Sequence, residues 1–275
     1  MSEPPPDSAG DLRERLSRIS RARPAGEVAG DKRRDAEDEP CRARLAPRRL
    51  EDYLPGEEIT GERGVFWFGR WEFDDRAIEA AEVLIELDAW MRSGERTPLL
   101  LLDLETTGFS GTPLFLAGIV EVDAAARPPK IAQLFARDYS EEAAVIEAIA
   151  ARLALRPTLV TFNGKSYDMP FLRDRAACHR IPLPEPADHV DLLHAARRRW
   201  RDVLPDCRLQ TLEAHLGGGY GRVGDVPGAE IPGRYHDAVR RGDPSGLFGV
   251  FLHNALDLVT LARLYVELMG EETRG

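Results

Sequence analysis

Asp103 and Glu105 interrupt the apolar run LLLLDLE that follows Pro98. A short continuous apolar run predicts a buried strand, and strand alternation puts residues two apart on the same face of a sheet. Burying unpaired carboxylates is costly, so such a pair is expected either to hold a cation or to lie at a solvated strand end. A solvated turn around Glu105 is the alternative for this pair taken alone.

A third acid, Asp168, follows another apolar strand, TLVTF, and stands at the start of a predicted helix. Asp is a favoured helix-capping residue, so a purely structural cap would also explain it. Asn163 lies between the two and is a candidate substrate contact. It is followed by glycine, and Asn-Gly is a strong turn signal, so a turn is the alternative for Asn163.

The last helix carries His253 and Asp257, which are four residues apart and project side by side from one helical face. A surface pair of little consequence is the alternative. Acids at the end of the first strand, after the fourth strand and on this helix can converge in an α/β fold. Four neighbouring carboxylates need divalent cations, and oxygen ligands favour Mg²⁺ or Mn²⁺ over Zn²⁺. The candidate metal ligands are Asp103, Glu105, Asp168 and Asp257.

Three consecutive strands are expected to position these acids, since FLAGIVEV and IAQLFAR follow LLLLDLE. A helix from Ser140 to about Leu155 comes next, and Pro157 stops it before TLVTF. Further helices are predicted over 168–179, 191–201, 210–216 and about 245–269. This order predicts an α/β fold in which helices flank a mixed sheet.

The chain is expected to comprise three regions. Residues 1–50 form a charged tail without apolar periodicity, which predicts disorder. Residues 51–97 hold the aromatic stretch GVFWFGRWEF, which predicts a hairpin arm, and then a helix; both are expected to pack on the core. Residues 98–270 form the main domain. Within it, the Gly- and Pro-rich segment GGGYGRVGDVPGAEIPG interrupts the core periodicity and predicts a loop.

Charge and composition restrict the class of protein. The formal net charge of -10 argues against a protein that coats nucleic acid nonspecifically, but it does not exclude a nuclease whose carboxylates hold metal ions. The three cysteines are far apart and match no metal-site spacing. No secretory signal opens the sequence and no apolar stretch approaches a membrane span, so we expect a cytoplasmic protein without a membrane partner.

Three motifs carry a family resemblance: DLETTG at 103–108, FNGKSYDMPFLRDR at 162–175 and HNALD at 253–257. In order and spacing they resemble the motifs of the DEDD superfamily of ribonuclease H-like 3′–5′ exonucleases. The middle motif is the most specific and is similar to the YprB-like exonuclease family. Similarity to that family also covers the segments at 191–200, 209–217 and 224–243.

The resemblance implies a ribonuclease H-like fold and a two-metal exonuclease that hydrolyses phosphodiester bonds at a free 3′ end of nucleic acid. It implies that the four acids bind two ions and that His253 is the general base. One departure stands out, because members with His usually place it five residues before the Asp, whereas members with Tyr place it four before. This chain combines His with the shorter spacing.

Substrate contacts are expected at two places besides Asn163. The resemblance implies that Thr106 and Phe109, in the turn after the first strand, touch the terminal nucleotide. Arg198 lies in the densest basic run of the expected fold and is a candidate phosphate contact, as are its neighbours Arg197, Arg199 and Arg201. A solvated helix face would look the same.

Two other functions remain open from the sequence. A degenerate ribonuclease H-like domain could bind nucleic acid or a protein without cutting, as the spacing of His253 and the acidic surface suggest. An endonuclease of related fold is the other alternative.

Overall fold

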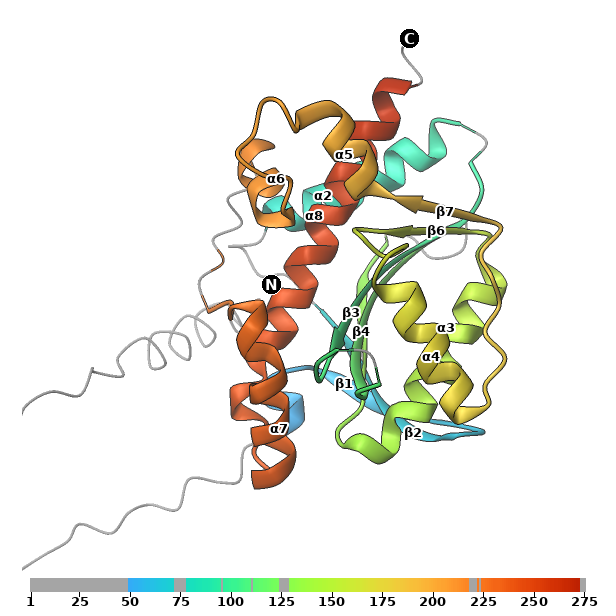
Figure 1. Cartoon of the computed structure of the whole chain (residues 1–275), viewed down its shortest axis with the longest axis vertical. Coiled ribbons are helices and arrows are strands. Elements are labelled where there is room, and N and C mark those ends of the chain that lie inside the picture. The colour runs from blue at the N-terminus through green and yellow to red at the C-terminus, as the bar shows by residue number, and fades with distance from the viewer. Residues whose placement is uncertain are drawn as a thin grey trace, which may run out of the picture. The chain divides into compact units, whose positions relative to one another are not determined.

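A computed structural model describes residues 49–71, 78–94, 96–109, 111–123, 129–217, 222 and 224–272. In this part of the chain a mixed sheet has the strand order β1-β2-β5-β4-β3-β6-β7 (Figure 1). The strand β3 pairs with β4 in antiparallel and with β6 in parallel orientation. The strands span Gly56–Gly61 (β1), Gly64–Arg70 (β2), Leu99–Thr106 (β3), Leu114–Val122 (β4), Ile131–Phe135 (β5), Thr158–Thr161 (β6) and Asp188–Asp191 (β7).

Helices cover both faces of this sheet, with α3 and α4 on one side and α2, α5, α6 and α8 on the other (Figure 1). The predicted mixed sheet flanked by helices is therefore confirmed. The helices span Ile78–Arg92 (α2), Glu142–Leu155 (α3), Asp168–His179 (α4), Leu192–Trp200 (α5), Leu209–His215 (α6), Ile231–Arg241 (α7) and Phe248–Glu272 (α8). Short 3-10 turns span Leu50–Asp52, Tyr139–Glu141, Gly228–Glu230 and Pro244–Gly246.

The central strand β3 separates two apolar clusters. Leu100, Leu102 and Leu104 pack with α3 and α4, whereas Leu99 and Leu101 pack with α2 and α8. Because side chains alternate along a strand, the odd-numbered Asp103 and Glu105 belong to the face that α8 covers. The sequence of β3 thus directs its two acids toward the last helix.

The long helix α8 lies across the sheet and supplies much of the second cluster. The segment Pro244–Gly270 reaches a mean hydropathy of 1.4 in its most apolar 18-residue window, which composition alone would allow in a membrane. The expectation that no stretch approaches this range is therefore wrong. Since 78% of that window is buried inside the fold, packing on the sheet accounts for its apolar composition.

Several elements differ from those predicted. The short strand β7 has the polar sequence DHVD and takes its extended form by pairing with β6, a long-range contact that local pattern does not reveal. The helix α7 begins within the segment predicted as a loop, and its Pro and Gly residues occupy the first turn. The predicted hairpin is β1 and β2, which extend the main sheet through β5. The predicted disordered tail lies outside the described residues, except for Arg49 and the start of the first 3-10 turn.

Candidate active site

Asp103 lies near the carboxyl end of β3 and is held by Asn254 of α8. The Asn254 Nδ2 atom donates to Asp103 Oδ2 at 2.8 Å and to the Asp103 carbonyl oxygen at 3.2 Å. Asn254 is fully buried, and burial of an amide favours arrangements in which its polar atoms are all bonded. The two hydrogen bonds from Asn254 fix the position of the Asp103 carboxylate and the distance between α8 and the sheet.

A row of three residues across the sheet forms the floor beneath Asn254. Asp103 in β3 is opposite Gly118 in β4, which in turn is opposite Gln133 in β5. The buried Gln133 Nε2 atom donates to Asn254 Oδ1 at 2.8 Å and to the Phe251 carbonyl oxygen at 2.8 Å. Asn254 therefore bonds to both Asp103 and Gln133, the two ends of the row. Gly118 lies between them and has no side chain, which leaves space for the Asn254 amide.

The close packing of α8 on β4 can be tested by a substitution at Gly118. A Cβ atom at this position would lie 2.1 Å from Asn254 Oδ1 and 2.7 Å from a Leu258 side-chain carbon, so Gly118→Ala must displace α8. We expect it to destabilise the protein by about 1–3 kcal/mol, the usual cost of overpacking a core. Urea unfolding measures the change.

Gly233→Ala in α7 is the matched control, because nothing lies within 4 Å of the added atom. It is expected to be neutral or to stabilise slightly, since alanine is favoured over glycine in a helix. Equal effects of the two substitutions would contradict the tight packing of Asn254 over β4.

Asp168 is the first residue of α4, and the turn before it is held by another aspartate. The Asp191 carboxylate accepts from the backbone nitrogens of Asn163 at 2.8 Å and Lys165 at 3.0 Å. Asn163 has a φ of 64°, the left-handed conformation that Asn tolerates in turns. The helix cap is Tyr167, without a side-chain cap bond, so the capping explanation of Asp168 is wrong. The Asp168 side chain is buried in the first turn of α4.

The four predicted ligands lie close enough to influence one another. Burial, together with the charges of Asp257 and Asp168, raises the pKa of Asp103 well above its ordinary value. Burial and the charges of Asp103, Asp257 and Asp168 raise the pKa of Glu105. Burial, with a smaller effect of Asp191, raises the pKa of Asp168 to about 7. The structure therefore gathers acids that repel one another and that a cation would relieve.

Asp257 is already paired with a cation of the chain itself. Arg222 Nη2 lies 2.6 Å from Asp257 Oδ1 and 2.6 Å from Glu213 Oε2, and its Nη1 lies 2.9 Å from Asp225 Oδ2. Among the described residues no group of three or more His, Cys, Asp or Glu side chains is arranged to hold an ion.

His253 lies between two of these acids. Its Nδ1 atom is 2.8 Å from Asp225 Oδ1, within hydrogen-bond distance, and its Nε2 atom is 3.4 Å from Asp257 Oδ2. Burial lowers the pKa of His253, but the bond to Asp225 and the charge of Asp257 outweigh it and raise the pKa above the ordinary value. Asp225 thus orients the ring so that Nε2 faces the acids.

The predicted substrate contacts lie in three places, the turn after β3, the turn before α4 and the helix α5. Thr106 is buried, and its hydroxyl donates to the Gly108 carbonyl oxygen at 2.8 Å, which shapes the turn after β3. Phe109 in the same turn is 85% exposed, unusual for a large apolar side chain. Asn163 and Arg198 are exposed, the former in the turn before α4 and the latter on α5.

The sequence reasoning missed five residues that organise the site. Asn254 and Gln133 looked like ordinary members of a helix and a strand, and their meaning depends on the register of the sheet. The others, Glu213, Arg222 and Asp225, form the ion cluster beside His253. Two of the segments noted outside the three motifs, 209–217 and 224–243, contain Glu213 and Asp225, so this similarity was a usable signal.

Comparison with known proteins places the fold in a family. Residues 100–269 match the family model of the RNase_H superfamily. The uncharacterized protein YprB of Bacillus subtilis (strain 168) is 32% identical over 175 residues, which cover 62% of this chain and 41% of that protein. The chain thus spans about two fifths of the length of this relative.

Two solved structures are similar to this chain. For the family B DNA polymerase from the hyperthermophilic archaeon Pyrobaculum calidifontis the TM-score is 0.50 at 15% identity, covering 63% of this chain and 25% of the polymerase. For a structure of exonuclease I the TM-score is 0.38 at 16% identity, covering 64% of this chain and 42% of that one.

Proposed function

The chain belongs to the RNase_H superfamily, and from this we propose that it is a metal-dependent 3′–5′ exonuclease that hydrolyses phosphodiester bonds of nucleic acid. One observation carries the proposal: the hydrogen bond from Asn254 to Asp103 holds α8, which bears His253 and Asp257, against the strand β3, which bears Asp103 and Glu105. Burial and the charges of nearby acids, Asp168 of α4 among them, raise the pKa values of both β3 carboxyls. Membership of the superfamily supports a nuclease-type function. The DEDD-type motifs support the direction of cleavage.

The residues present fit divalent cations. The side chains of Glu105 and Asp168 have no hydrogen-bond or ion-pair partner in another side chain within the described part of the chain, although burial raises the pKa of both carboxyls. A bound cation would favour the charged form of such groups. An all-oxygen set suits Mg²⁺ or Mn²⁺, and we propose that Asp103, Glu105, Asp168 and Asp257 hold two ions.

The chain's own residues would orient and deprotonate the attacking water. Bound divalent ions would supply Lewis acidity and stabilise charge at the scissile phosphate. His253 would take the proton from water at Nε2, because Asp225 engages Nδ1 and stabilises the charged ring that results. Asn254 would keep the Asp103 carboxylate in place through its hydrogen bond. Protonated His253 could then return its proton to solvent between cycles.

The proposed substrate is a nucleic acid with a free 3′ end. The exposed ring of Phe109 offers a stacking surface for a terminal base, next to the turn that Thr106 shapes. Asn163 and Arg198 are the proposed contacts to the rest of the terminal segment.

Arg222 favours a second candidate function, a domain that binds nucleic acid or a protein without cutting it. Its guanidinium neutralises Asp257, one of the four proposed ligands, from a distance of 2.6 Å. A protein of this kind would need no divalent ion, and its acids would be structural partners of arginine.

Cleavage of an end-labelled strand tests the proposed function. With Mg²⁺ or Mn²⁺, a 5′-labelled single strand of DNA or RNA is expected to give a ladder that shortens from the 3′ end, and EDTA is expected to abolish it. A covalently closed circle offers no end and is expected to stay intact. A cut circle would assign an endonuclease, and the absence of any ladder on both substrates would contradict the nuclease proposal.

A further inference from the structure

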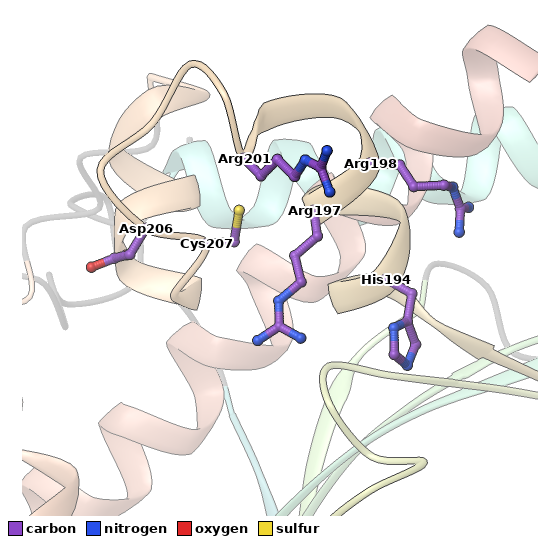
Figure 2. Close-up of a pocket in the computed structure, with 6 residues that line it drawn as sticks. All are labelled: His194, Arg197, Arg198, Arg201, Asp206 and Cys207. Atoms are coloured by element: carbon purple, nitrogen blue, oxygen red, sulfur yellow. The ribbon is translucent and has the colours of Figure 1, made fainter.

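A hollow of about 520 Å³ opens between α5 and the segment that leads to α6. The lining residues are His194, Arg197, Arg198, Arg201, Asp206 and Cys207 (Figure 2). Four of these six side chains come from α5 or the residue that follows it, and three of the four are arginines. The hollow is therefore a basic feature on a chain whose formal net charge is -10.

The helix α5 divides into a basic face and an apolar face. The basic positions follow one another at helical spacing, 194, 197, 198 and 201, so they form a stripe about 10 Å long at a rise of about 1.5 Å per residue. The opposite face packs against α8 and is buried, and it consists of Leu192, Leu193, Ala196 and Trp200. Packing holds the helix and thus fixes the direction in which the stripe faces.

The arginines of the stripe are largely free of internal partners. In the part of the chain that the structure describes, no carboxylate lies within ion-pair distance of Arg197 or Arg198. Arg201 has an ion-pair contact of 3.5 Å with Asp202, and both of these side chains are highly exposed, so solvent weakens the pair. The one acid that lines the hollow, Asp206, accepts from the Thr211 hydroxyl at 2.6 Å and from the Arg208 backbone nitrogen. Asp206 thus serves the start of α6 and leaves Arg197 and Arg198 without a compensating acid among the described residues.

The stripe begins close to the candidate active site. The strands β3, β6 and β7 are parallel, so their carboxyl ends, where Asp103 and Asp191 lie, share one edge of the sheet. Asp191 both caps α5 by accepting from the Leu193 backbone nitrogen at 3.1 Å and holds the turn that leads to Asp168. The first residue of the stripe, His194, follows this cap by one turn of helix.

We propose that this hollow binds the phosphodiester backbone of the nucleic-acid strand whose 3′ end lies in the candidate active site. The proposal rests on the proposed function and adds to it the path of the strand upstream of the cleaved bond. Guanidinium groups suit phosphate oxygens because they are planar and permanently charged, and contacts to the backbone are independent of base sequence. Arginines without a compensating acid on an acidic protein also offer a polyanion a local site of attraction.

Charge removal in the hollow tests the proposal. Binding of a fluorescein-labelled (dT)20 strand is measured by anisotropy in EDTA between 50 and 200 mM salt, so that no strand is cut. The double variant Arg197→Gln/Arg201→Gln is expected to weaken binding at 50 mM salt by at least about tenfold. Its slope of log affinity against log salt should be smaller in magnitude by roughly 1.4, since each phosphate contact on a single strand contributes about 0.7.

Arg240→Gln/Arg241→Gln, at the exposed end of α7, removes the same charge elsewhere and should leave the slope unchanged. Equal weakening by both double variants, or no measurable binding by the parent protein, would overturn the proposal. Displacement of the strand by 10 mM inorganic phosphate at constant ionic strength would assign the hollow to a small anion and also overturn it. The binding assay contains no divalent ion, so it does not depend on cleavage. A protein that binds the strand in this assay but gives no ladder in the cleavage assay would therefore refute only the nuclease function.

Discussion

Replacing Asp103 by asparagine is expected to lower the rate of strand cleavage by about 10³-fold or more. The substitution preserves shape but removes a negative charge from the face of β3 that meets α8. Lewis-acid stabilisation of a phosphoryl transition state is worth several kcal/mol, and each 1.36 kcal/mol corresponds to about tenfold in rate. The measurement is the initial rate of the 5′-labelled ladder in Mn²⁺, with the Mn²⁺ affinity taken from calorimetry.

This loss should occur without unfolding, because Asp103 is one of several acids that repel one another. Burial and the charges of Asp257 and Asp168 raise its pKa, so the neutral amide should leave the metal-free protein as stable as before or more stable at pH 8. Asp237→Asn on α7 is the control for an exposed aspartate and should keep full activity. A ladder of unchanged rate in Asp103→Asn would remove the basis of the metal site.

The sequence alone was enough to locate β3 and α8 because both carry strong local signals. An apolar run interrupted by two acids is costly unless it serves a site, and the helical spacing of His253 and Asp257 puts them on one face. Asp168 was found by its position after an apolar strand. The order of strands then left few ways of arranging the sheet.

The parts that sequence could not supply depend on contacts between distant segments. Asn254 acquires its role only when Gly118 lies between Asp103 and Gln133 in the sheet, a matter of register. Arg222 and Asp225 lie in a Gly- and Pro-rich segment without periodicity, and long-range ion pairs with Glu213 and Asp257 fix them. Local patterns carry no information on such pairs.

The metal-free protein is expected to be less stable at pH 8 than at pH 5.5. Asp168 has a pKa of about 7 in the folded chain, against an ordinary value of 3.8. A carboxyl whose pKa is raised by folding favours the folded state most below its unfolded pKa, and this contribution is lost as the pH rises through the folded pKa. At 1.36 kcal/mol per unit, Asp168 alone would cost about 2 kcal/mol between pH 5.5 and pH 8.

The other groups of the site with shifted pKa values either add to this loss of stability or titrate outside the range from pH 5.5 to pH 8. Asp103 and Glu105 have raised pKa values and therefore the same sign. The raised pKa of His253 also has this sign, because a histidine that holds its proton in the fold loses that stabilisation as the pH rises. Asp225 has a lowered pKa, so its stabilisation is lost only in more acidic solution, below its ordinary range.

Divalent ions are expected to reverse this pH dependence. Because ions bind the ionised carboxylates, Mn²⁺ at about 100 times its Kd should stabilise the protein by about 2.7 kcal/mol per independent site, and more strongly at pH 8 than at pH 5.5. Urea unfolding in EDTA and in Mn²⁺ at both pH values measures the effect. Stability that increases with pH in EDTA would contradict convergence of the acids. Stability that falls with pH but does not respond to Mn²⁺ would favour a binding domain in which Arg222 and His253, rather than a divalent ion, compensate the charge of Asp257.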